Sequence, residues 1–371
     1  MHQLLIMLPI YQPYLPKNCL RYAHEALDST WISSQGIYID KAKERLKEAV
    51  GSRYVILVNN GTCATHMLAL GLKHKYPHLK KILVPNNVYV AAWNSFLFSG
   101  GFELKPLDAR LDTWNIDQRL IKDYDHETAL LVVHNLGNIL NVPALREQHP
   151  GLQIVEDACE GLFGTYNDRS AGTAAVMGSV SFFGNKTITS GEGGAVFTDD
   201  EDLFEYLNSV RGQGQSSVRY VHDKLGYNYR MTNIQAALLY GQLEIKDEIR
   251  EMKQTVFELY HKELSGVDEV RFQYQEPGTT HAQWMFAVRF DGFTYEKKRA
   301  LELFLFENNI ETRPMFYPIN HHTHLREMRG DMKVATQLNH QALLLPSFPE
   351  LTRGQVLSVC RKIKEFLSTH A

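Results

Sequence analysis

The chain has 371 residues, of which 44% are hydrophobic and 22% are charged, and its formal net charge at pH 7 is −3. This length is enough for a large hydrophobic core and for two domains. A net charge this small provides no electrostatic attraction to nucleic acid or to an anionic membrane, so neither is expected as a partner.

The N-terminal stretch MHQLLIMLPIYQPYLP contains a short apolar run that Pro9 interrupts. It has no basic leader and no small-residue cleavage site, so a signal peptide is not expected. No stretch reaches the roughly 18 apolar residues of a transmembrane helix. The four cysteines, Cys19, Cys63, Cys159 and Cys360, include no C-x-x-C pair. This spacing is typical of reduced thiols in the cytoplasm rather than of disulfides or a zinc site.

The first part of the chain predicts helices around a buried strand. After an extended start to about residue 15, the pattern predicts helices at Lys17–Leu27 and 38–50, a strand at Tyr54–Val58 and a helix at Thr62–Leu72. The turn Asn59-Asn60-Gly61-Thr62 joins this strand to this helix. It puts the free amides of a helix N-terminus directly after a strand, and such amides attract phosphate. An ordinary strand-to-helix turn is the alternative, because α/β folds contain many of them.

Strands and helices continue to alternate up to about residue 211. Further strands are predicted at 81–84, 102–107, 129–133, 152–155, 179–183 and 194–198, with helices from about Val88 and at about 200–211. This alternation predicts a largely parallel sheet with right-handed crossovers. Ligands of such sheets bind at the carboxyl ends of the strands.

Two residues near predicted strand ends suit cofactor chemistry. Asp157 follows the apolar run Gln153-Ile154-Val155 and Glu156, and Lys186 lies between an apolar run and a glycine cluster. A lysine withdrawn from water is a nucleophile. Pyridoxal 5′-phosphate (PLP) needs a lysine for a Schiff base and a carboxylate that keeps its ring nitrogen protonated. From the residues alone, a helix-capping Asp157 and a surface Lys186 are the alternative.

The segment SFFGNKTITSGEGG, which contains Lys186, resembles the signature of the DegT/DnrJ/EryC1/StrS family of sugar-nucleotide aminotransferases. The resemblance extends from YQPYLP to LPSFP and is closest to members that act on GDP-4-keto-6-deoxymannose. It implies the PLP fold type I, which is aspartate aminotransferase-like. We expect a large α/β domain at residues 1–244, with a mostly parallel seven-stranded sheet flanked by helices, and a smaller α+β domain at residues 245–371.

The resemblance also implies roles for the cofactor-binding residues. Lys186 and Asp157 are the expected catalytic residues, and both bind the cofactor. The residues expected at the cofactor phosphate are Gly61, Thr62 and Ser181. Tyr89 is expected on the face of the cofactor ring, and Glu160 at its 3-hydroxyl group. In the loop after His134, Leu136 and Asn141 stand where the family usually has Tyr and Asp, so this loop is assigned no catalytic role.

A second block, GYNYRMTNIQAALLYGQLE, is expected to reach across a homodimer interface. There Asn228 would complete the phosphate site of the partner subunit, and Arg230 would face the substrate. The other expected substrate contacts are Trp31 in STWISSQGIYID and Arg313 and Tyr317 in IETRPMFYPI. A packed Trp31, and an Asn228 in a turn before a helix capped by Thr232, are the alternatives.

The resemblance implies transfer of an amino group from L-glutamate, through pyridoxamine phosphate, to C4 of a nucleotide-linked 4-keto-6-deoxyhexose. UDP- or dTDP-linked 4-keto-6-deoxyglucose is the alternative to the GDP-linked sugar. Two alternatives are less favoured. One is a sugar dehydratase, because the family's dehydratases carry histidine in place of the lysine, and the other is a non-catalytic relative, because Lys186 and Asp157 are both present. No G-x-G-x-x-G or P-loop supports a nucleotide-binding module without PLP. His321, His322 and His324 are expected in a solvated loop rather than at a metal.

Overall fold

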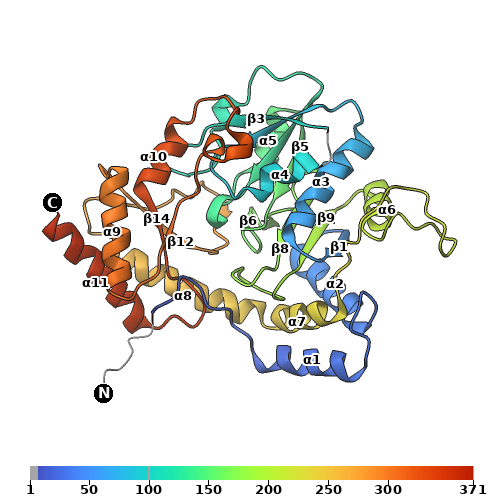
Figure 1. Cartoon of the computed structure of the whole chain (residues 1–371), viewed down its shortest axis with the longest axis horizontal. Coiled ribbons are helices and arrows are strands. Elements are labelled where there is room, and N and C mark those ends of the chain that lie inside the picture. The colour runs from blue at the N-terminus through green and yellow to red at the C-terminus, as the bar shows by residue number, and fades with distance from the viewer. Residues whose placement is uncertain (1–6, 99–100, 371) are drawn as a thin grey trace.

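A seven-stranded sheet with helices on both faces forms the centre of the computed structural model, which describes residues 7–98 and 101–370 (Figure 1). The strand order is β1-β9-β8-β5-β4-β2-β3, and only β9 runs against the other strands. The strands are β1 Tyr54–Val58, β2 Lys81–Pro85, β3 Glu103–Leu107, β4 Thr128–Val133, β5 Gln153–Asp157, β8 Gly178–Ser181 and β9 Gly194–Thr198.

Apolar residues on both sides of most strands explain why helices cover both faces of the sheet. In β1, Ile56 and Val58 belong to one core cluster, whereas Val55 and Leu57 belong to another. Side chains alternate between the faces of a strand, so this sheet needs a cover on each side. The helices of this part are α1 Lys17–Asp28, α2 Ile37–Val50, α3 Gly61–Lys75, α4 Ala91–Phe98, α5 Val142–Gln148, α6 Glu201–Val210 and α7 Asn233–Glu244.

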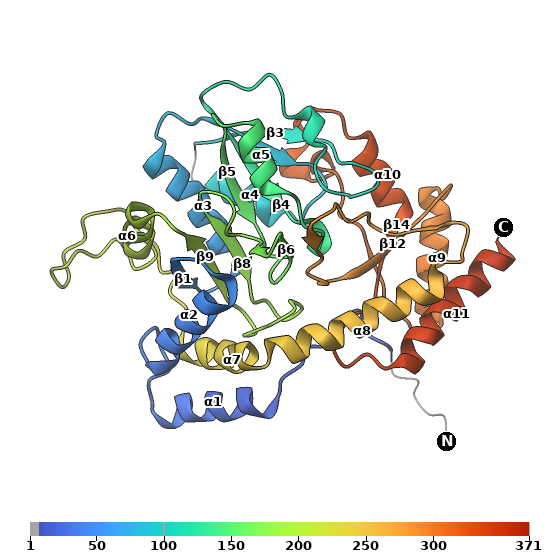
Figure 2. The same cartoon turned by 180° about the vertical axis from the view of Figure 1, so that it is seen from behind.

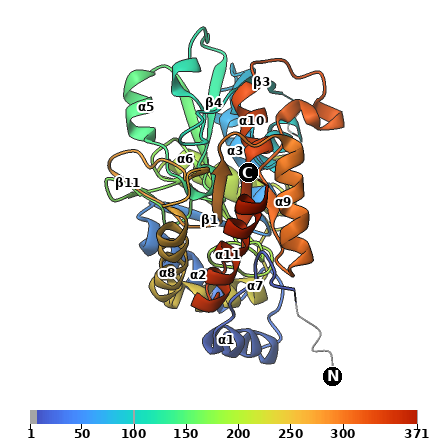
Figure 3. The same ribbon diagram turned by 90° about the vertical axis from the view of Figure 1, so that its left-hand side faces the viewer.

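A second sheet lies after α8 (Lys246–Leu264) and has the strand order β10-β12-β14-β13. Figures 2 and 3 show α8 and α11 along this part of the molecule, and the two helices are in contact. Its core cluster joins the sheet to α8, α9 and α11. The elements are β10 Val270–Arg271, β12 Phe286–Phe290, α9 Tyr295–Glu307, β13 Arg313–Pro314, α10 Lys333–Gln341, β14 Ala342–Leu345 and α11 Arg353–Thr369.

The predicted α/β class with a mostly parallel seven-stranded sheet is confirmed. Several predicted boundaries differ by up to three residues: α4 begins at Ala91 rather than near Val88, α3 ends at Lys75 rather than Leu72, and β8 ends at Ser181 rather than at residue 183. The domain boundary after residue 244 stays a prediction, although the second sheet lies wholly beyond it. Part of the predicted extended start, residues 1–6, lies outside the described residues. Among the described helices, none is long and apolar enough to cross a membrane.

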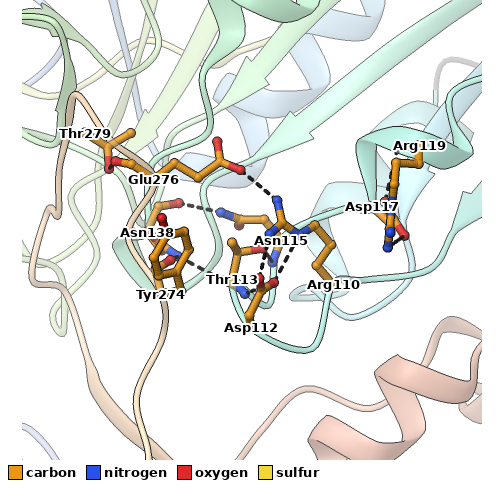
Figure 4. Close-up of polar contacts among 10 residues, drawn as sticks. All are labelled: Arg110, Asp112, Thr113, Asn115, Asp117, Arg119, Asn138, Tyr274, Glu276 and Thr279. Carbon is orange, nitrogen blue, oxygen red and sulfur yellow. Dashed lines mark hydrogen bonds and ion pairs between the residues drawn. The ribbon is translucent and has the colours of Figure 1, made fainter.

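The segment between β10 and β12 is fastened to the loop that follows β3 (Figure 4). Tyr274 N donates to Asp112 O (2.8 Å), and Arg110 Nη1 donates to Glu276 Oε1 (2.9 Å). Asn138 Nδ2 also donates to Tyr274 O (2.9 Å). These bonds hold the approach to β12 against the first sheet, and the short strands β11 (Thr279–Thr280) and β6 (Thr165–Tyr166) pair beside it.

A lysine is buried where α8 meets the approach to β12 and the segment after β14. Lys253 is 0% exposed, and its Nζ donates to Trp284 O (2.8 Å) and to Ser347 O. Both acceptors are neutral carbonyls, so the ammonium has hydrogen bonds but no counter-charge from them. Burial lowers the pKa of Lys253 from 10.5 to about 7, because a charged group loses hydration inside a protein.

We predict that Lys253→Met flattens the pH dependence of stability. Between pH 7 and 10.5 the unfolded chain binds a proton that the folded chain does not. The contribution of Lys253 to the free energy of unfolding therefore rises with pH in this window, by up to roughly 1.4 kcal/mol per pH unit, and Lys253→Met removes it. Urea unfolding at a series of pH values measures this slope. Lys262→Met, at an exposed position of the same helix, should keep it. An equal slope in the two variants would contradict the prediction.

Candidate active site

A cavity of about 720 Å³ opens at the carboxyl ends of the parallel strands, where the two sheets meet. Nine of the twelve residues predicted for the site line it: Gly61, Thr62, Tyr89, Asp157, Glu160, Ser181, Lys186, Arg313 and Tyr317. They come from the ends of β5 and β8 and the loops after them, from the N-terminus of α3, from the loop after β2, and from β13 and the loop after it.

The N-terminus of α3 and the end of β8 form one corner of the cavity. Asn60 caps α3, since its side chain accepts a hydrogen bond from Cys63 N (2.8 Å). A Cβ at Gly61 would lie 2.6 Å from Ser181 Cβ, so only glycine lets the two elements approach this closely. The corner therefore brings the amides of the first helical turn together with the hydroxyls of Thr62 and Ser181, which is a favourable setting for phosphate.

The two carboxylates at the end of β5 have different surroundings. Glu156 is buried and accepts four hydrogen bonds, from His134 Nε2 (2.9 Å) and from the amides of residues 172, 174 and 175. Leu140 N donates to His134 Nδ1 (3.2 Å), so the ring carries its proton on Nε2. Asp157 accepts a bond from Cys159 N (2.9 Å) and lines the cavity. Of the two, Asp157 is the carboxylate that can meet a ligand.

Glu160 lies one turn beyond Asp157 and also lines the cavity. Its Oε2 accepts a hydrogen bond from Leu136 N (2.7 Å), and burial raises its pKa from 4.5 to about 7. The charge of Lys186 acts in the opposite direction on this carboxyl group. The loop after His134, which was assigned no catalytic role, thus holds Glu160 through a backbone amide.

Lys186 follows β8 in a loop that folds back on itself. Its N donates to Phe183 O (2.9 Å), and its carbonyl accepts a bond from Tyr11 OH (2.9 Å). The side chain is half-buried, and Nζ lies 3.8 Å from the centroid of the Trp284 ring. The amine therefore rests on an aromatic face inside the cavity.

The outer wall is aromatic. Tyr89 is 60% exposed and lies 6.3 Å from Phe316, measured between ring centroids. Tyr317 stacks on His321, with 4.4 Å between the centroids. Burial raises the pKa of Tyr317, with smaller contributions from Tyr295 and from Glu302. Arg313 is exposed at the start of β13.

Three predicted residues do not line the cavity of their own chain. Asn228 and Arg230 lie beside the end of β1, where Asn59 N donates to Tyr229 O (2.8 Å) and Arg230 pairs with Val58. Trp31 is 57% exposed and accepts a bond from Asn233 Nδ2 on its carbonyl (2.7 Å). Their expected roles stay predictions.

Two residues that the sequence reasoning missed also line the cavity. The segment QWMFAVRF at residues 283–290, which contains Trp284, has a pattern that predicts only a strand, and His66 lies in the predicted helix Thr62–Leu72, whose pattern indicates only an apolar face. His66 Nδ1 lies 3.1 Å from Tyr229 OH, and burial lowers its pKa to about 4, so the ring is neutral at pH 7. The local sequence around a tryptophan or histidine in an apolar run does not indicate that its side chain lines a cavity.

The rings of the three clustered histidines contact different neighbours. His324 contacts Asn94 Oδ1 (2.8 Å), His321 stacks on Tyr317, and the His322 ring lies 5.4 Å from that of Trp93. Within residues 7–98 and 101–370, no group of three or more His, Cys, Asp or Glu side chains could hold a metal ion.

The model of the DegT/DnrJ/EryC1/StrS aminotransferase family matches residues 13–364. The chain belongs to this family. A relative from Escherichia coli O157:H7, named GDP-perosamine synthase, is 34% identical and spans 97% of this chain and 99% of its own length. GDP-perosamine synthase of Vibrio cholerae is 32% identical over 98% of this chain and 100% of its own.

A solved member of the same fold is the E. coli GDP-4-keto-6-deoxy-D-mannose-3-dehydratase with bound hydrated PLP. Its TM-score is 0.88 at 21% identity, covering 96% of this chain and 99% of that one. At this identity the likeness concerns the fold. The fold expected for the DegT/DnrJ/EryC1/StrS family is therefore confirmed.

The cavity fits PLP, the cofactor of these aminotransferases. His66 Nε2 is buried, lines the cavity and has no hydrogen-bond partner among the described residues, as expected for a wall that receives a polar ligand. The corner at Gly61 suits a phosphate. An amine at Lys186 and a carboxylate at Asp157 supply the groups that an aldehyde and a ring nitrogen need.

We predict that Glu160→Gln raises the stability of the cofactor-free protein at pH 8. Because the folded-state pKa of about 7 exceeds the unfolded value of 4.5, the folded chain holds a proton that the unfolded chain has released. Stability is thus lost as pH rises from 4.5 through 7, by at most about 3 kcal/mol. Glutamine keeps an oxygen for Leu136 N and removes this loss.

Urea unfolding of the cofactor-free protein between pH 4.5 and 8 tests the Glu160 prediction. Glu251→Gln, at an exposed site on α8, serves as the control and should leave the pH profile unchanged. A Glu160→Gln profile that falls as steeply as the native one would show that this carboxyl group is ionised in the folded chain throughout the range.

Proposed function

We propose that the chain is a PLP-dependent aminotransferase that moves the amino group of L-glutamate to C4 of GDP-4-keto-6-deoxymannose, giving GDP-perosamine. The observation that carries the proposal is the meeting of Lys186 and Asp157 in one cavity. The identity of the substrate is supported by two relatives, each named GDP-perosamine synthase, that match over nearly the full length.

PLP supplies an aldehyde that takes up the amino group and a ring that draws electrons from the reacting carbon. In the proposal, Lys186 Nζ binds the aldehyde until the donor displaces it. The freed amine then removes the proton from the α-carbon of glutamate, and in the second half-reaction it delivers a proton to C4 of the sugar. Asp157 holds the proton on the ring nitrogen through a charge-assisted hydrogen bond.

The remaining cavity residues are proposed to orient the two ligands. Gly61, Thr62 and Ser181 bind the phosphate, and Glu160 binds the 3-hydroxyl group. Tyr89 covers the ring face. Arg313 is proposed at the diphosphate, because its planar donor fork suits phosphate oxygens, and Tyr317 at the sugar.

We also propose a homodimer. The loop before Asn228 exposes several large apolar side chains, namely Val218 (60%), Tyr220 (78%), Val221 (46%) and Leu225 (87%). Such patches are typical of protein interfaces. Asn228 and Arg230 lie outside their own cavity, so in the proposal they complete the partner's phosphate site and substrate site, with Trp31 also on the substrate side. The cytoplasmic location is proposed from the four free cysteines alone.

Other substrates and activities lead to different products. UDP- or dTDP-linked 4-keto-6-deoxyglucose would give the corresponding 4-amino sugar. A dehydratase would release a deoxy sugar without adding nitrogen, and a non-catalytic relative would give no product. Lys186 favours amino transfer over dehydration, because the family's dehydratases carry histidine at this position, and the presence of both Lys186 and Asp157 argues against a non-catalytic relative.

We predict that both half-reactions can be observed separately with purified PLP-loaded protein. Glutamate should bleach the visible absorbance of the bound cofactor and yield one 2-oxoglutarate per site. GDP-4-keto-6-deoxymannose should then restore the absorbance and give a 4-amino sugar by mass spectrometry. Lys186→Ala should lower both rates by roughly a thousandfold or more, because the proton carrier is gone, whereas Lys262→Ala should leave them unchanged.

Bleaching by glutamate without recovery on the GDP sugar would contradict the proposed substrate and keep the aminotransferase class. The UDP- and dTDP-linked sugars would then be tested in turn. A deoxy sugar without nitrogen would identify a dehydratase. Native rates in Lys186→Ala would exclude this residue from the chemistry.

We predict that two inactive variants restore activity when their subunits are mixed. Lys186→Ala and Asn228→Ala each damage every site of a homodimer. In a mixed dimer, one site receives both native residues if Asn228 acts on the partner's cavity. Unfolding and refolding the two together should therefore recover up to about a quarter of native activity, since half the dimers are mixed and each has one intact site. Absence of recovery, with mixed dimers shown by native mass spectrometry, would place Asn228 in its own subunit's site.

A further inference from the structure

The indole ring of Trp284 covers the amine of Lys186. The ring centroid lies 3.8 Å from Nζ, and both residues line the cavity. Trp284 is 6% exposed, so water has little access to its ring. An amine N–H over an indole face is attracted by the negative charge of the ring's π-system, whether the amine is neutral or charged, and the attraction is stronger where water is excluded.

Trp284 is itself held at both ends. Its Nε1 donates to Asn185 O (2.8 Å), and its own carbonyl accepts a bond from Lys253 Nζ (2.8 Å). The next carbonyl in the loop, that of Lys186, accepts a bond from Tyr11 OH (2.9 Å). Two aromatic side chains thus hold two successive carbonyls of this loop, and one of the two also touches the amine that the loop carries.

Lys253 lies behind both aromatic side chains. Besides its bond to Trp284 O, its Nζ lies 5.1 Å from the centroid of the Tyr11 ring. A buried indole N–H needs an acceptor, and here the acceptor is the residue directly before Lys186. The ring and the lysine loop therefore form one rigid unit.

We infer that Trp284 is a positioning residue for Lys186, holding its amine in the orientation that captures the PLP aldehyde. A lysine side chain has many rotamers, and few of them point Nζ at one carbon atom. A ring that holds the amine reduces this search, and orientation of reacting groups is a major source of rate. The inference rests on the proposed function, because it takes Lys186 as the residue that binds the cofactor.

Capture can be measured apart from binding. It joins Nζ to the aldehyde carbon, and the aldehyde oxygen leaves as water with two hydrogens of the amine. Borohydride then delivers hydride to that carbon, and solvent protonates the nitrogen, so a stable secondary amine marks each capture event. Pyridoxamine phosphate has an amine in place of the aldehyde and cannot join Lys186, so its Kd reports the pocket alone.

The experiment uses the full-length cofactor-free protein with native sequence, Trp284→Leu or Trp284→Phe. The rate of borohydride-fixed modification of Lys186 is followed by peptide mass spectrometry, and the Kd of pyridoxamine phosphate is measured in parallel. Trp284→Leu should slow capture by roughly tenfold and change the Kd by less than about twofold. Trp284→Phe keeps a ring face, so its capture rate should lie between those of the native protein and Trp284→Leu. Trp114→Phe, a buried tryptophan outside the cavity, should change neither.

Capture at the native rate in Trp284→Leu would overturn the inference, as would an equal loss of capture and of pyridoxamine phosphate binding. A native chain in which PLP never modifies Lys186 would overturn the proposed function as well. If the Trp284→Leu variant does not fold, the contact between Trp284 and Lys186 is tested instead by tryptophan fluorescence emission. Lys186→Met should change the emission of the cofactor-free protein, and this change should vanish in a Trp284→Phe background. A change that persists there would overturn the inference.

Discussion

The buried carboxylate of Glu156 holds together the edge of the first sheet where the cavity lies. It is 1% exposed and accepts bonds from the His134 ring and from three amides of the turn at residues 172–175. A carboxylate is stable away from water only when its oxygens are bonded in this way. These bonds tie the end of β4, the end of β5 and the turn before β8 to one another.

The position of Asp157 depends on this arrangement. β5 continues from Glu156 directly into Asp157, and neighbouring residues of a strand point to opposite faces. Once the side chain of Glu156 is fixed on one face, that of Asp157 must face the other, where the cavity lies. A residue that does not touch the cavity thus determines the direction of one that does.

Much of the sheet and part of the cavity could be predicted from the sequence. The alternation of strands and helices up to residue 211 requires parallel strands, and parallel strands bring Asp157 and the loop of Lys186 to one edge. The reversed direction of β9, which pairs antiparallel with both β8 and β1, was not predicted. The pattern of a short apolar strand is the same in either direction.

Some residues near Lys186 could not be predicted because they are distant from it in the sequence. Trp284 and Tyr11 contact the Lys186 loop from sequence positions 99 and 175 residues distant, and their apolar neighbours are typical of a core. Asn228, Arg230 and Trp31 pose a different problem. The sequence of one chain does not show whether a side chain contributes to the site of its own subunit or to that of the partner subunit.

The two walls of the cavity have separate structural origins. Asp157 and Ser181 end strands of the seven-stranded sheet and Lys186 follows one, whereas Arg313 begins β13, an edge strand of the four-stranded sheet, and Tyr317 follows it. The second sheet has a core cluster of its own, whereas Ile319 and Leu325, which follow β13, pack into the core of the first sheet. Under the proposed function, substitutions at Arg313 and Tyr317, which belong to neither core cluster, can therefore alter which sugar nucleotide is accepted while Asp157 and Lys186 keep their positions. A protein built this way can acquire new substrates in evolution while its chemistry is conserved.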